Sequence, residues 1–405
     1  MKLNRPMTKR IILLLAITVT LAALSSRMRA DTGTCGGQMI MLPFTDVASS
    51  IFFCSIAQAF FTGLTNGTSP TTYSPSDFAT REQMAAFITR TQDSALKRSG
   101  IRATAGQWWT PQSAGILKAT AVGTIPRFIC FDGEDIWVAN SSGDSVTRVH
   151  ASDGRVLSTW TGAIGAFNTI AAAGFIFVTG ADNPGVLYRI DPAQPPGATT
   201  VVANDLGPSP ISIAFDGLNL WTANEGVVVG AGSISRYNVI TDLTTTFTLG
   251  FNQPAGIVFD GAHLWVLDRG TNHLHRVNPA NGTILESVSV GTTSTSAAIP
   301  VFDGSNIWVP VQNAVAVVST SVPPVLLATL TGNGLGLSNG AAAFDGERIM
   351  VTSVGSDTVS LWKASSLTPL GFLSTGDSTS NPRGVCSDGL HFWITLQGLN
   401  QLVRF

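Results

Sequence analysis

A phrase of about ten residues recurs along the chain, and this repeat constrains the fold more than any other feature. Its clearest copies are "FDGEDIWVAN" from Phe131 and "FDGLNLWTAN" from Phe215. Seven units are visible, and the large apolar residue of each "IWV" segment is Trp137, Phe177, Trp221, Trp265, Trp308, Met350 and Trp393. These residues are 40 to 44 positions apart, a period typical of the four-stranded blade of a β-propeller. We therefore predict an all-β fold, a seven-bladed propeller.

The unit that begins at Ala255 shows how one blade is encoded. "AGIVFDG" is a short apolar run that ends in Asp260-Gly261, a pair suited to reversing the chain into "HLWVLD". "NHLHRVNP" and "TILESVSVG" supply two more strands, separated by a turn at Asn281-Gly282. The composition agrees, because only 12% of the residues are charged and 41 are glycine, which suits short strands and tight turns.

The seventh unit is one strand short, which indicates how the ring closes. It contains "GVCSDG", "HFWITLQG" and "NQLVRF", and it ends at Phe405. The segment "GILKATAVG", Gly115 to Gly123, resembles a fourth strand but precedes the first blade. We therefore predict that Ile116 to Val122 pairs with the last blade, and that the propeller spans residues 115–405. Closure of this kind removes the exposed sheet edges that promote aggregation.

The aromatic and acidic residues of the phrase have structural explanations. We expect the aromatic side chain to fill the space between neighbouring sheets, where one Trp or Phe removes on the order of 150 to 250 Å² from water. Each acidic residue of the phrase precedes glycine, and we expect it to form the turn rather than a ring of catalytic carboxylates. These residues are Asp132, Asp216, Asp260, Asp303, Asp345 and Asp388.

Residues 1–30 are predicted to be a secretory signal. Four basic residues precede an apolar run from Ile11 to Leu24. This run has 14 residues, fewer than the roughly 20 that span a bilayer, so we expect no transmembrane span. Removing the signal takes away six of the 23 basic residues and leaves 25 acidic ones, a net charge of about -8. Because no basic stripe remains, we expect no nucleic-acid partner.

Residues 31–95 are predicted to form a small helical module, and residues 96–114 a linker. The segment from Ser50 to Leu64 is apolar on most sides and has a glycine stop at Gly63, as in a buried helix. After a turn-rich middle, Thr80 and Gln83 have the spacing of a capping box at the start of a second helix. The sequence therefore predicts a helix, a loop and a helix.

These residues resemble the S-layer homology module. The matching segments are "FTDV" from Phe44, "GLTNGT" from Gly63, "YSP" from Tyr73 and "TREQMAAF" from Thr80. The resemblance implies binding to an anionic cell-wall polymer or carbohydrate through Asp46, Thr80 and Arg81. An arginine at a helix N-terminus suits an anion, because its donor fork and the helix dipole act together. In the alternative, Asp46 and Thr80 only cap helices, Arg81 is a solvated charge and the single copy is a spacer.

Four cysteines in an exported chain permit disulfides, whose pairing the sequence does not fix. Cys130 and Cys386 occupy equivalent inner-strand positions in blades one and seven, which are neighbours in the ring. A bond across this seam is one candidate disulfide, although inner strands of neighbouring blades can lie beyond the separation of about 4.4 to 6.8 Å between Cα atoms that a disulfide requires. Cys35 with Cys54 is the other candidate.

The repeats resemble the YVTN family of β-propellers through "WVAN" from Trp137, "FVTG" from Phe177 and "MVTS" from Met350. The resemblance implies a surface-exposed, extracellular protein and no chemistry. Streptogramin lyases resemble the same repeats, so the alternative is a propeller lyase or hydrolase with a site in the central channel. The five histidines do not converge on one site, and we expect His273 and His275 to be a solvated pair. We predict no catalytic residue, metal or cofactor.

The loops between second and third strands lie on the face opposite the Asp-Gly turns. They are small, polar and mostly uncharged, as in "NSSGDS" and "GADNPG", and their few acids, Glu225 and Asp268, lack an evident partner. Such loops suit a glycan or a protein surface. The leading hypothesis is a secreted, cell-surface binding or scaffold protein, anchored by the helical module to wall polymer. A purely structural surface-layer component is a further alternative.

Overall fold

The computed structural model divides the chain into two compact units, Met1–Lys97 and Arg98–Phe405. It describes residues 30–405 apart from 36–37, 62–64, 66, 81–83, 85–117, 294–296 and 377. Among the helices of these described residues, none is long and apolar enough to cross a lipid bilayer.

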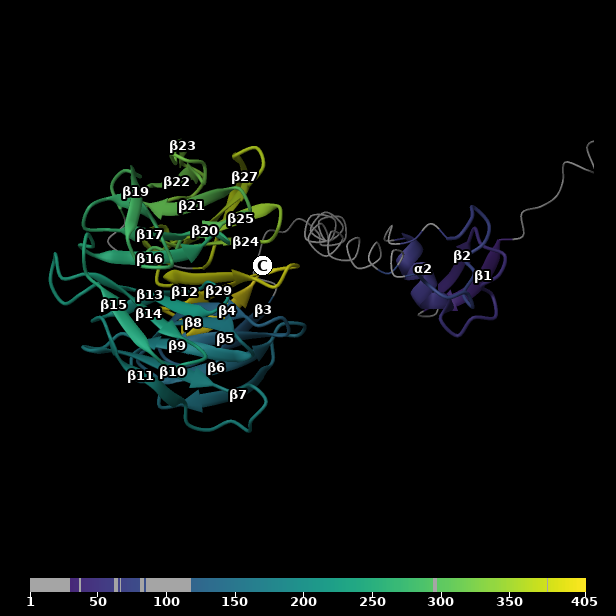
Figure 1. Ribbon diagram of the computed structural model, residues 1–405, viewed down its shortest axis with the longest axis horizontal. Coiled ribbons are helices and arrows are strands. Elements are labelled where there is room, and N and C mark those ends of the chain that lie inside the picture. Colours follow the sequence, from purple (N-terminus) through teal and green to yellow (C-terminus); the bar gives the residue numbers. More distant parts are fainter. Residues whose placement is uncertain are drawn as a thin grey trace, which may run out of the picture. The chain divides into compact units, whose positions relative to one another are not determined.

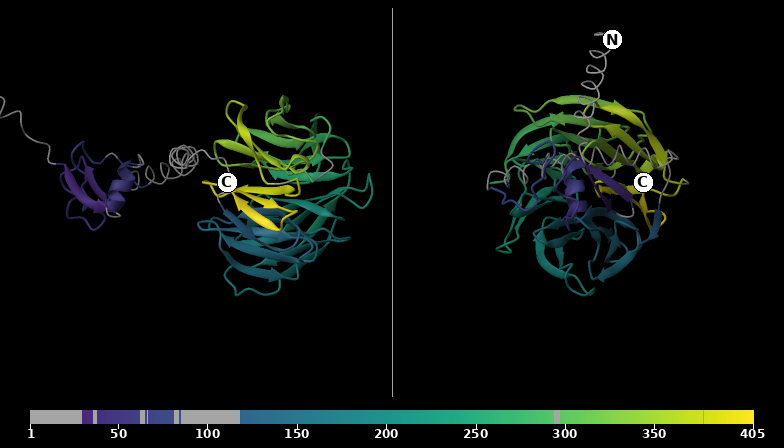
Figure 2. Two further views of the ribbon diagram at one scale, coloured as in Figure 1. Left: turned by 180° about the vertical axis from the view of Figure 1, so that it is seen from behind. Right: turned by 90° about the vertical axis from the view of Figure 1, so that its right-hand side faces the viewer.

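The described residues of the larger unit form seven four-stranded antiparallel sheets arranged around a common axis (Figures 1 and 2). The first strand of each sheet contacts the first strands of both neighbouring sheets, so these strands form a closed inner ring. In six blades the strands follow chain order from this inner strand to the rim. The structure therefore confirms the predicted seven-bladed propeller of four-stranded blades.

The strands of the first four blades are given from the axis outward. Blades one and two contain β4 (Pro126–Phe131), β5 (Asp135–Asn140), β6 (Ser145–His150), β7 (Val156–Thr161), β8 (Ala166–Ala172), β9 (Phe175–Gly180), β10 (Gly185–Ile190) and β11 (Thr200–Leu206). Blades three and four contain β12 (Pro210–Phe215), β13 (Asn219–Asn224), β14 (Ser233–Asn238), β15 (Thr244–Phe247), β16 (Pro254–Phe259), β17 (Leu264–Asp268), β18 (His273–Val277) and β19 (Ile284–Ser289).

The remaining blades follow the same plan. Blades five and six contain β20 (Val301–Phe302), β21 (Asn306–Val311), β22 (Ala314–Ser319), β23 (Leu326–Thr331), β24 (Asn339–Phe344), β25 (Arg348–Ser353), the 3-10 turn η1 (Val354–Ser356), β26 (Thr358–Lys363) and β27 (Thr368–Ser374). Blade seven contains β28 (Pro382–Ser387), β29 (Phe392–Leu396), β30 (Gln401–Arg404) and, out of chain order, β3 (Lys118–Ala121).

The strand β3 closes the ring by completing the last blade, as predicted. It pairs antiparallel with β30 in a register that places Thr120 opposite Leu402. The amide of Val122 continues the ladder by donating to the carbonyl of Asn400 at 3.0 Å. The buried Thr120 hydroxyl also donates to the carbonyl of Gly154 at 2.6 Å, which ties β3 to blade one. The outermost strand of the seventh blade therefore comes from the start of the domain.

A hydrogen bond between the turn Asp and the strand Trp explains why the phrase recurs. In blade four, Asp260 Oδ1 accepts from the amides of Ala262 and His263 at 2.8 and 2.6 Å, which fixes the turn. Its Oδ2 accepts from the indole of Trp265 at 2.7 Å. The same indole bond, at 2.7 to 2.8 Å, occurs in Trp137–Asp132, Trp221–Asp216, Trp308–Asp303 and Trp393–Asp388. The predicted turn role of the Asp is confirmed, and the bond to Trp is an addition to it.

In the two blades without this Trp, the turn between the first and second strands is stabilised differently. In blade six the equivalent residue is Met350, which has no donor, and Asp345 Oδ2 accepts instead from Arg348 Nε at 2.7 Å. In blade two the equivalent residue is Phe177, and the turn is Ala173-Gly174, in which both residues have positive φ. Where the indole donor is absent, the Asp therefore either takes a different donor or is itself absent.

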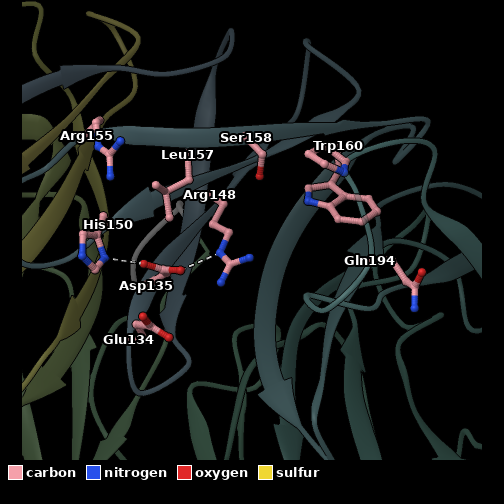
Figure 3. A pocket seen from close by; sticks show the side chains of 10 residues that line it. Glu134, Asp135, Arg148, His150, Arg155, Leu157, Ser158, Trp160 and Gln194 are labelled. Carbon is pink, nitrogen blue, oxygen red and sulfur yellow. Dashed lines mark hydrogen bonds and ion pairs between the residues drawn. The ribbon is translucent and has the colours of Figure 1, made fainter.

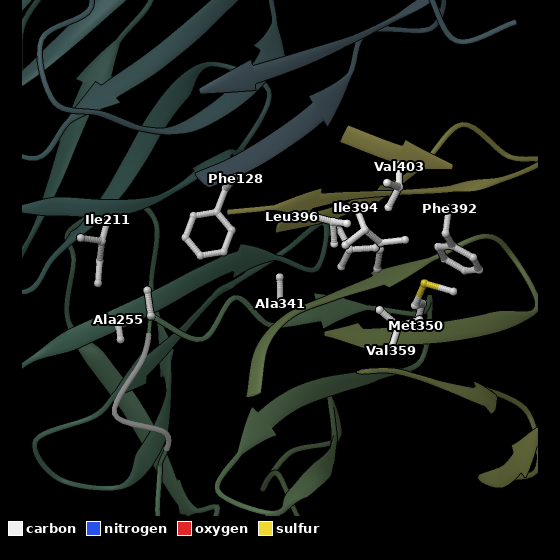
Figure 4. Packing of buried hydrophobic residues seen from close by; sticks show 13 residues of the cluster. Phe128, Ile211, Ala255, Ala341, Met350, Val359, Phe392, Ile394, Leu396 and Val403 are labelled. Carbon is white, nitrogen blue, oxygen red and sulfur yellow. The ribbon is translucent and has the colours of Figure 1, made fainter. Parts of the chain in front are cut away.

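The Trp side chains fill the space between neighbouring blades. All five tryptophans of the phrase have an exposed fraction of 0%. Trp265 packs with Ile307 and Val309 of blade five, and Trp393 packs with Ile136 and Val138 of blade one. Each of these side chains therefore contacts the second strand of the next blade. A separate apolar cluster combines inner-strand residues such as Phe128, Ile211 and Ala255 with residues of blades six and seven such as Met350 and Ile394 (Figure 4).

We expect the Asp-to-Trp hydrogen bond to contribute measurably to stability, and blade three offers a test. Burial raises the pKa of Asp216, but hydrogen bonds from the Trp221 indole and the amides of Asn219 and Leu218 outweigh it, so the pKa is below its usual value. A depressed pKa stabilises the fold above the unfolded pKa of about 3.9 and loses that effect as pH falls through the folded pKa. Asp216→Asn should cost about 1.5 to 3 kcal/mol at pH 7, with the cost shrinking below pH 4.

Urea unfolding across this pH range measures the Asp216 effect. Trp221→Phe is the matched partner, because it removes the donor and keeps most of the apolar volume. The loss in the double variant should be smaller than the sum of the two single losses. Additive losses, or a loss for Asp216→Asn that does not change with pH, would show that the bond is energetically unimportant.

The smaller unit combines a β-hairpin with a short helix. The strands β1 (Asp31–Cys35) and β2 (Gln38–Leu42) pair antiparallel, and α2 (Phe53–Phe61) follows. Leu42, Phe44 and Ile56 belong to its buried core. Asp31 Oδ2 accepts from the amides of Val47 and Ala48 at 2.7 and 2.8 Å, which holds the chain between strand and helix.

This arrangement corrects the prediction of a mainly helical module. The first helix is present within the predicted Ser50 to Leu64 and begins at Phe53, three residues later than predicted, and the hairpin was not predicted. In β2, Met39 and Met41 are largely exposed while Leu42 is buried, a strand alternation too short to dominate the sequence pattern. The predicted second helix falls mostly outside the described residues, which here include only Met84, whose amide donates to the carbonyl of Thr80 at 2.9 Å.

Candidate functional site

Three cavities of the propeller lie between neighbouring blades, on the side of the Asp-Gly turns. One of about 410 Å³ lies between blades one and two (Figure 3). One of about 580 Å³ lies between blades five and six, and one of about 260 Å³ lies nearer the inner strands of blades one and two. The first, here called the blade-one pocket, is lined by Glu134, Asp135, Arg148, His150, Arg155, Leu157, Ser158, Trp160, Gln194 and Pro196.

A buried carboxylate organises the blade-one pocket. Asp135, the first residue of β5, is 1% exposed and accepts from Arg148 Nε at 2.5 Å and from His150 Nδ1 at 2.8 Å. The pairing of β5 with β6 places Asp135 opposite His150, and Arg148 is two residues away on the same face. The carboxylate therefore holds the imidazole with Nδ1 turned inward, which leaves Nε2 as the nitrogen that can meet a ligand.

Arg148 is fixed by contacts on several sides. Its guanidinium lies over the ring of Trp137, 5.1 Å from the ring centroid, and Nη1 donates to the carbonyl of Pro192 at 3.1 Å. The latter bond connects blade one to the loop of blade two that lines the same pocket. This fixed orientation makes Arg148 a pre-organised donor rather than a solvated charge.

Trp160 lines the other end of the pocket and carries an unpaired donor. The side chain is 5% exposed, and its Nε1 is buried with no hydrogen-bond partner among the described residues. Figure 3 shows Trp160 on the side of the pocket nearer Gln194. Because buried donors are nearly always paired, this pocket is chemically suited to a ligand that presents an acceptor oxygen near the indole.

The sequence did not predict this group of residues. Three strands of one blade supply these residues, which are Asp135, Arg148, His150 and Trp160. The signal that could have identified them is the cross-strand register. The sixth residue of the third strand lies opposite the first residue of the second strand. His150 was expected to remain apart from the other histidines, and it does, but its partner is a carboxylate.

The pair His273 and His275 differs from the prediction of a solvated pair. His275 is 6% exposed, its Nδ1 lies 2.8 Å from Ser287 Oγ, and its Nε2 lies 3.8 Å from Asp268 Oδ2. Asp268 also accepts from the amides of Asn252 and Gln253 at 2.7 and 3.0 Å. Burial raises the pKa of Asp268, but the contacts with His275 and these amides outweigh it and lower the pKa. Asp268 thus has partners, contrary to expectation, and it stabilises a loop.

Glu225 also has a partner, which the sequence analysis did not find. Its carboxylate pairs with Arg269 of the next blade, and both side chains are about one-fifth exposed. Across the described residues, no group of three or more His, Cys, Asp or Glu side chains gathers at distances that would hold a metal ion.

The residues predicted to bind wall polymer lie in the smaller unit. Asp46 does not cap a helix: its carboxylate accepts from the amides of Tyr73 and Ser74 at 2.9 and 2.7 Å and so orders the loop that contains "YSP". Thr80 is exposed, at the end of the described segment. Arg81 lies outside the described residues, so its place relative to Asp46 and Thr80 stays a prediction.

The four cysteines form one disulfide. Cys35 and Cys54 are bonded, with 5.6 Å between their Cα atoms, and connect β1 to α2. Cys130 and Cys386 are free, so the candidate disulfide across the seam is not formed. Burial raises the pKa of the Cys130 thiol to about 12 and that of the Cys386 thiol well above its usual range, which keeps both thiols protonated and unreactive at neutral pH.

Comparisons with known proteins support the fold. No protein-family model matches the chain, and no curated protein matches it significantly in sequence. Among solved structures, it is similar to hydrazine synthase from Kuenenia stuttgartiensis, with a TM-score of 0.57 and 18% identity over 72% of this chain and 99% of that chain. At this identity the likeness shows the propeller fold alone.

Proposed function

We propose that this protein works outside the cytoplasm as a binding protein of the cell envelope. In this proposal residues 1–30 direct export, the smaller unit attaches to anionic wall polymer, and the propeller binds a polar ligand. The observation that carries the proposal is the disulfide between Cys35 and Cys54, because structural disulfides belong mainly to oxidising compartments such as the cell surface. The S-layer homology and YVTN resemblances of the sequence agree with this setting.

The smaller unit offers a structural basis for wall attachment. Asp46 orders the backbone at Tyr73 and Ser74, and the disulfide fixes the start of the unit against α2. The hydrogen bonds between Asp46 of "FTDV" and the backbone of "YSP" thus support a loop that comes shortly before Thr80 in the chain. Arg81, directly after Thr80, is the proposed contact for an anionic group of the polymer.

Arg81→Ala is expected to reduce retention of the full chain on purified cell-wall polymer about tenfold or more, since a charge-assisted hydrogen bond contributes about 1.5 to 3 kcal/mol. Lys363→Ala is the matched control, because it removes one positive charge from a propeller side chain that is 44% exposed and does not line the blade-one pocket. A pulldown at physiological salt measures both. If the unaltered chain is not retained, or if both variants lose retention equally, the attachment proposal fails.

The propeller's binding role rests on the blade-one pocket. A fixed arginine, a carboxylate-bound imidazole and an unpaired indole donor line one cavity between two blades. This set of neutral and charged donors suits the hydroxyl and carboxyl groups of a glycan better than an apolar ligand. The pocket lies on the face of the Asp-Gly turns, whereas the sequence had favoured the loops of the opposite face.

A propeller lyase or hydrolase is the second candidate, and one observation favours it. The bond between His150 Nδ1 and Asp135 is the arrangement that orients an imidazole for acid–base chemistry. Turnover of small lactones by the purified chain, lost in His150→Gln, would decide for this candidate over the binding protein.

A further inference from the structure

Two arginines begin neighbouring inner strands at the loop end of the propeller axis. Arg127 is the second residue of β4 and Arg383 the second residue of β28. These strands are adjacent in the inner ring, and they approach closely: a Cβ atom on Gly384 would lie 2.5 Å from the carbonyl oxygen of Arg127. Both arginines therefore have fixed backbones at one seam, where the first and last blades meet.

Arg127 contacts neutral groups from three blades. Its guanidinium lies over the ring of Phe167 in blade two, 5.1 Å from the centroid. Nε donates to Ser141 Oγ of blade one and Nη1 to Gln397 Oε1 of blade seven, both at a long 3.4 Å. Ser141 and Gln397 follow the second strands of their blades, so Arg127 lies at the end of the axis that carries the loops between second and third strands. None of these contacts neutralises its charge.

Arg383 is the less satisfied of the two. Its Nε and Nη1 are buried and have no hydrogen-bond partner among the described residues. Its backbone is well held, since Thr352 Oγ1 donates to its carbonyl at 2.8 Å. Burial, and then the positive charge of Arg127, lower the pKa of Arg383 to about 10. Burial also lowers the pKa of Arg127.

No carboxylate of the described part of the chain pairs with either arginine. The ion pairs found there include neither Arg127 nor Arg383. Asp357, from the loop beside the start of β28, is used elsewhere: its Oδ1 accepts from Ser380 Oγ and from the amide of Asn381 at 2.8 and 2.7 Å. Glu225, on the same side of the propeller, is paired with Arg269.

We propose that Arg127 and Arg383 form a binding site for an oxyanion, the carboxylate or phosphate group of a ligand that enters at the loop end of the axis. This inference goes beyond the proposed function and rests neither on wall attachment nor on the blade-one pocket. Two like charges that are partly buried and unpaired are unfavourable, and a planar guanidinium is well matched to carboxylate and phosphate oxygens.

The apolar side chains of the neighbouring inner strands are buried. Phe128, Ile211 and Ala255 are 1 to 3% exposed and belong to one apolar cluster (Figure 4). Phe167 packs against this cluster and also beneath Arg127. Because these side chains are buried, the proposed contact with the ligand is made by the two guanidinium groups.

The test is thermal unfolding of the purified full chain, titrated with succinate in one arm and inorganic phosphate in the other, at ionic strength held constant with chloride. We expect a saturable rise in the unfolding midpoint in at least one arm, because a ligand that binds only the folded state stabilises it. A larger shift with succinate would identify a carboxylate ligand, and a larger shift with phosphate a phosphorylated one.

Four variants complete the test. Arg383→Gln and Arg127→Gln should each weaken the apparent affinity at least tenfold, and Arg383→Lys, which keeps the charge but loses the donor fork, should do so too. Without anion, Arg383→Gln should unfold at the same temperature as the unaltered chain or higher, since it removes an unpaired buried charge. Lys363→Gln, at a side chain that is 44% exposed and lines neither candidate site, should behave like the unaltered chain.

The proposal is overturned if neither anion gives a saturable shift, or if the shift in Arg383→Gln equals that in Lys363→Gln. A loss of stability in Arg383→Gln without anion would show that water or protein already satisfies the guanidinium, which also overturns it. Wall retention in the Arg81 experiment is independent of these outcomes, so failure of the anion site would leave the attachment proposal standing.

Discussion

Thr120→Pro is expected to open the propeller. The bond from the Val122 amide to Asn400 and the alternation of antiparallel pairs place the Thr120 amide toward Leu402. Proline removes this donor and also the hydroxyl that bonds to Gly154. We expect a loss of about 3 kcal/mol or more in the free energy of unfolding, together with concentration-dependent aggregation, because β30 then exposes its edge.

Ala119→Pro is the matched control for this experiment. Ala119 is the neighbouring residue, is exposed, and by the same alternation directs its amide away from β30, where proline is tolerated on an edge strand. Urea unfolding and light scattering compare the two variants. Equal stability of both variants would mean that pairing between β3 and β30 does not hold the ring closed.

Trp265→Ala is expected to cause the largest loss among single side-chain changes. Trp265 is fully buried and packs with Leu267, Ile307 and Val309, so its removal leaves a cavity between blades four and five. Replacing a buried Trp by Ala typically costs about 3 to 5 kcal/mol. The change also leaves Asp260 Oδ2 without its indole donor, which places the expected loss toward the upper end of that range.

Trp265→Phe separates the two contributions of this residue. It keeps most of the packing and removes only the donor, so the expected loss is about 1 to 3 kcal/mol. Leu249→Ala is the control for a general effect of truncation, because Leu249 is 90% exposed and its truncation should change the unfolding free energy by no more than about 0.5 kcal/mol. If Trp265→Phe is as destabilising as Trp265→Ala, the hydrogen bond rather than the packing dominates.

Much of the propeller could be predicted from the sequence because every blade repeats the same short-range signals. The Asp-Gly turns and the spacing of Trp137, Trp221 and Trp265 are local, and a missing strand in blade seven had one suitable replacement. Even the bond between Asp and Trp is encoded locally, since the two are always five residues apart. The smaller unit lacks such repetition: an apolar run and a capping box predicted helices after residue 50, and no comparable signal marked the hairpin Asp31–Leu42.

The candidate sites were harder to predict because they are made by contacts between blades. Trp160 and Gln194 line one pocket only because a loop of blade two lies beside the outer strand of blade one. Arg127 and Arg383 are far apart in sequence and become neighbours only when the ring closes. Each is an unremarkable basic residue in its own strand, so the charge pattern alone does not identify the pair.

The exchange of the outermost strand has a consequence for how the protein is made. The segment that completes blade seven is synthesised before all the other blades, and its partner, Gln401–Arg404, is at the very end of the chain. The strand β3 therefore has no partner until β30 is in place, although β3 precedes every other strand of the propeller. Pairing between strands so far apart in the sequence is slow, so the completion of blade seven is expected to be a late step in the folding of the propeller.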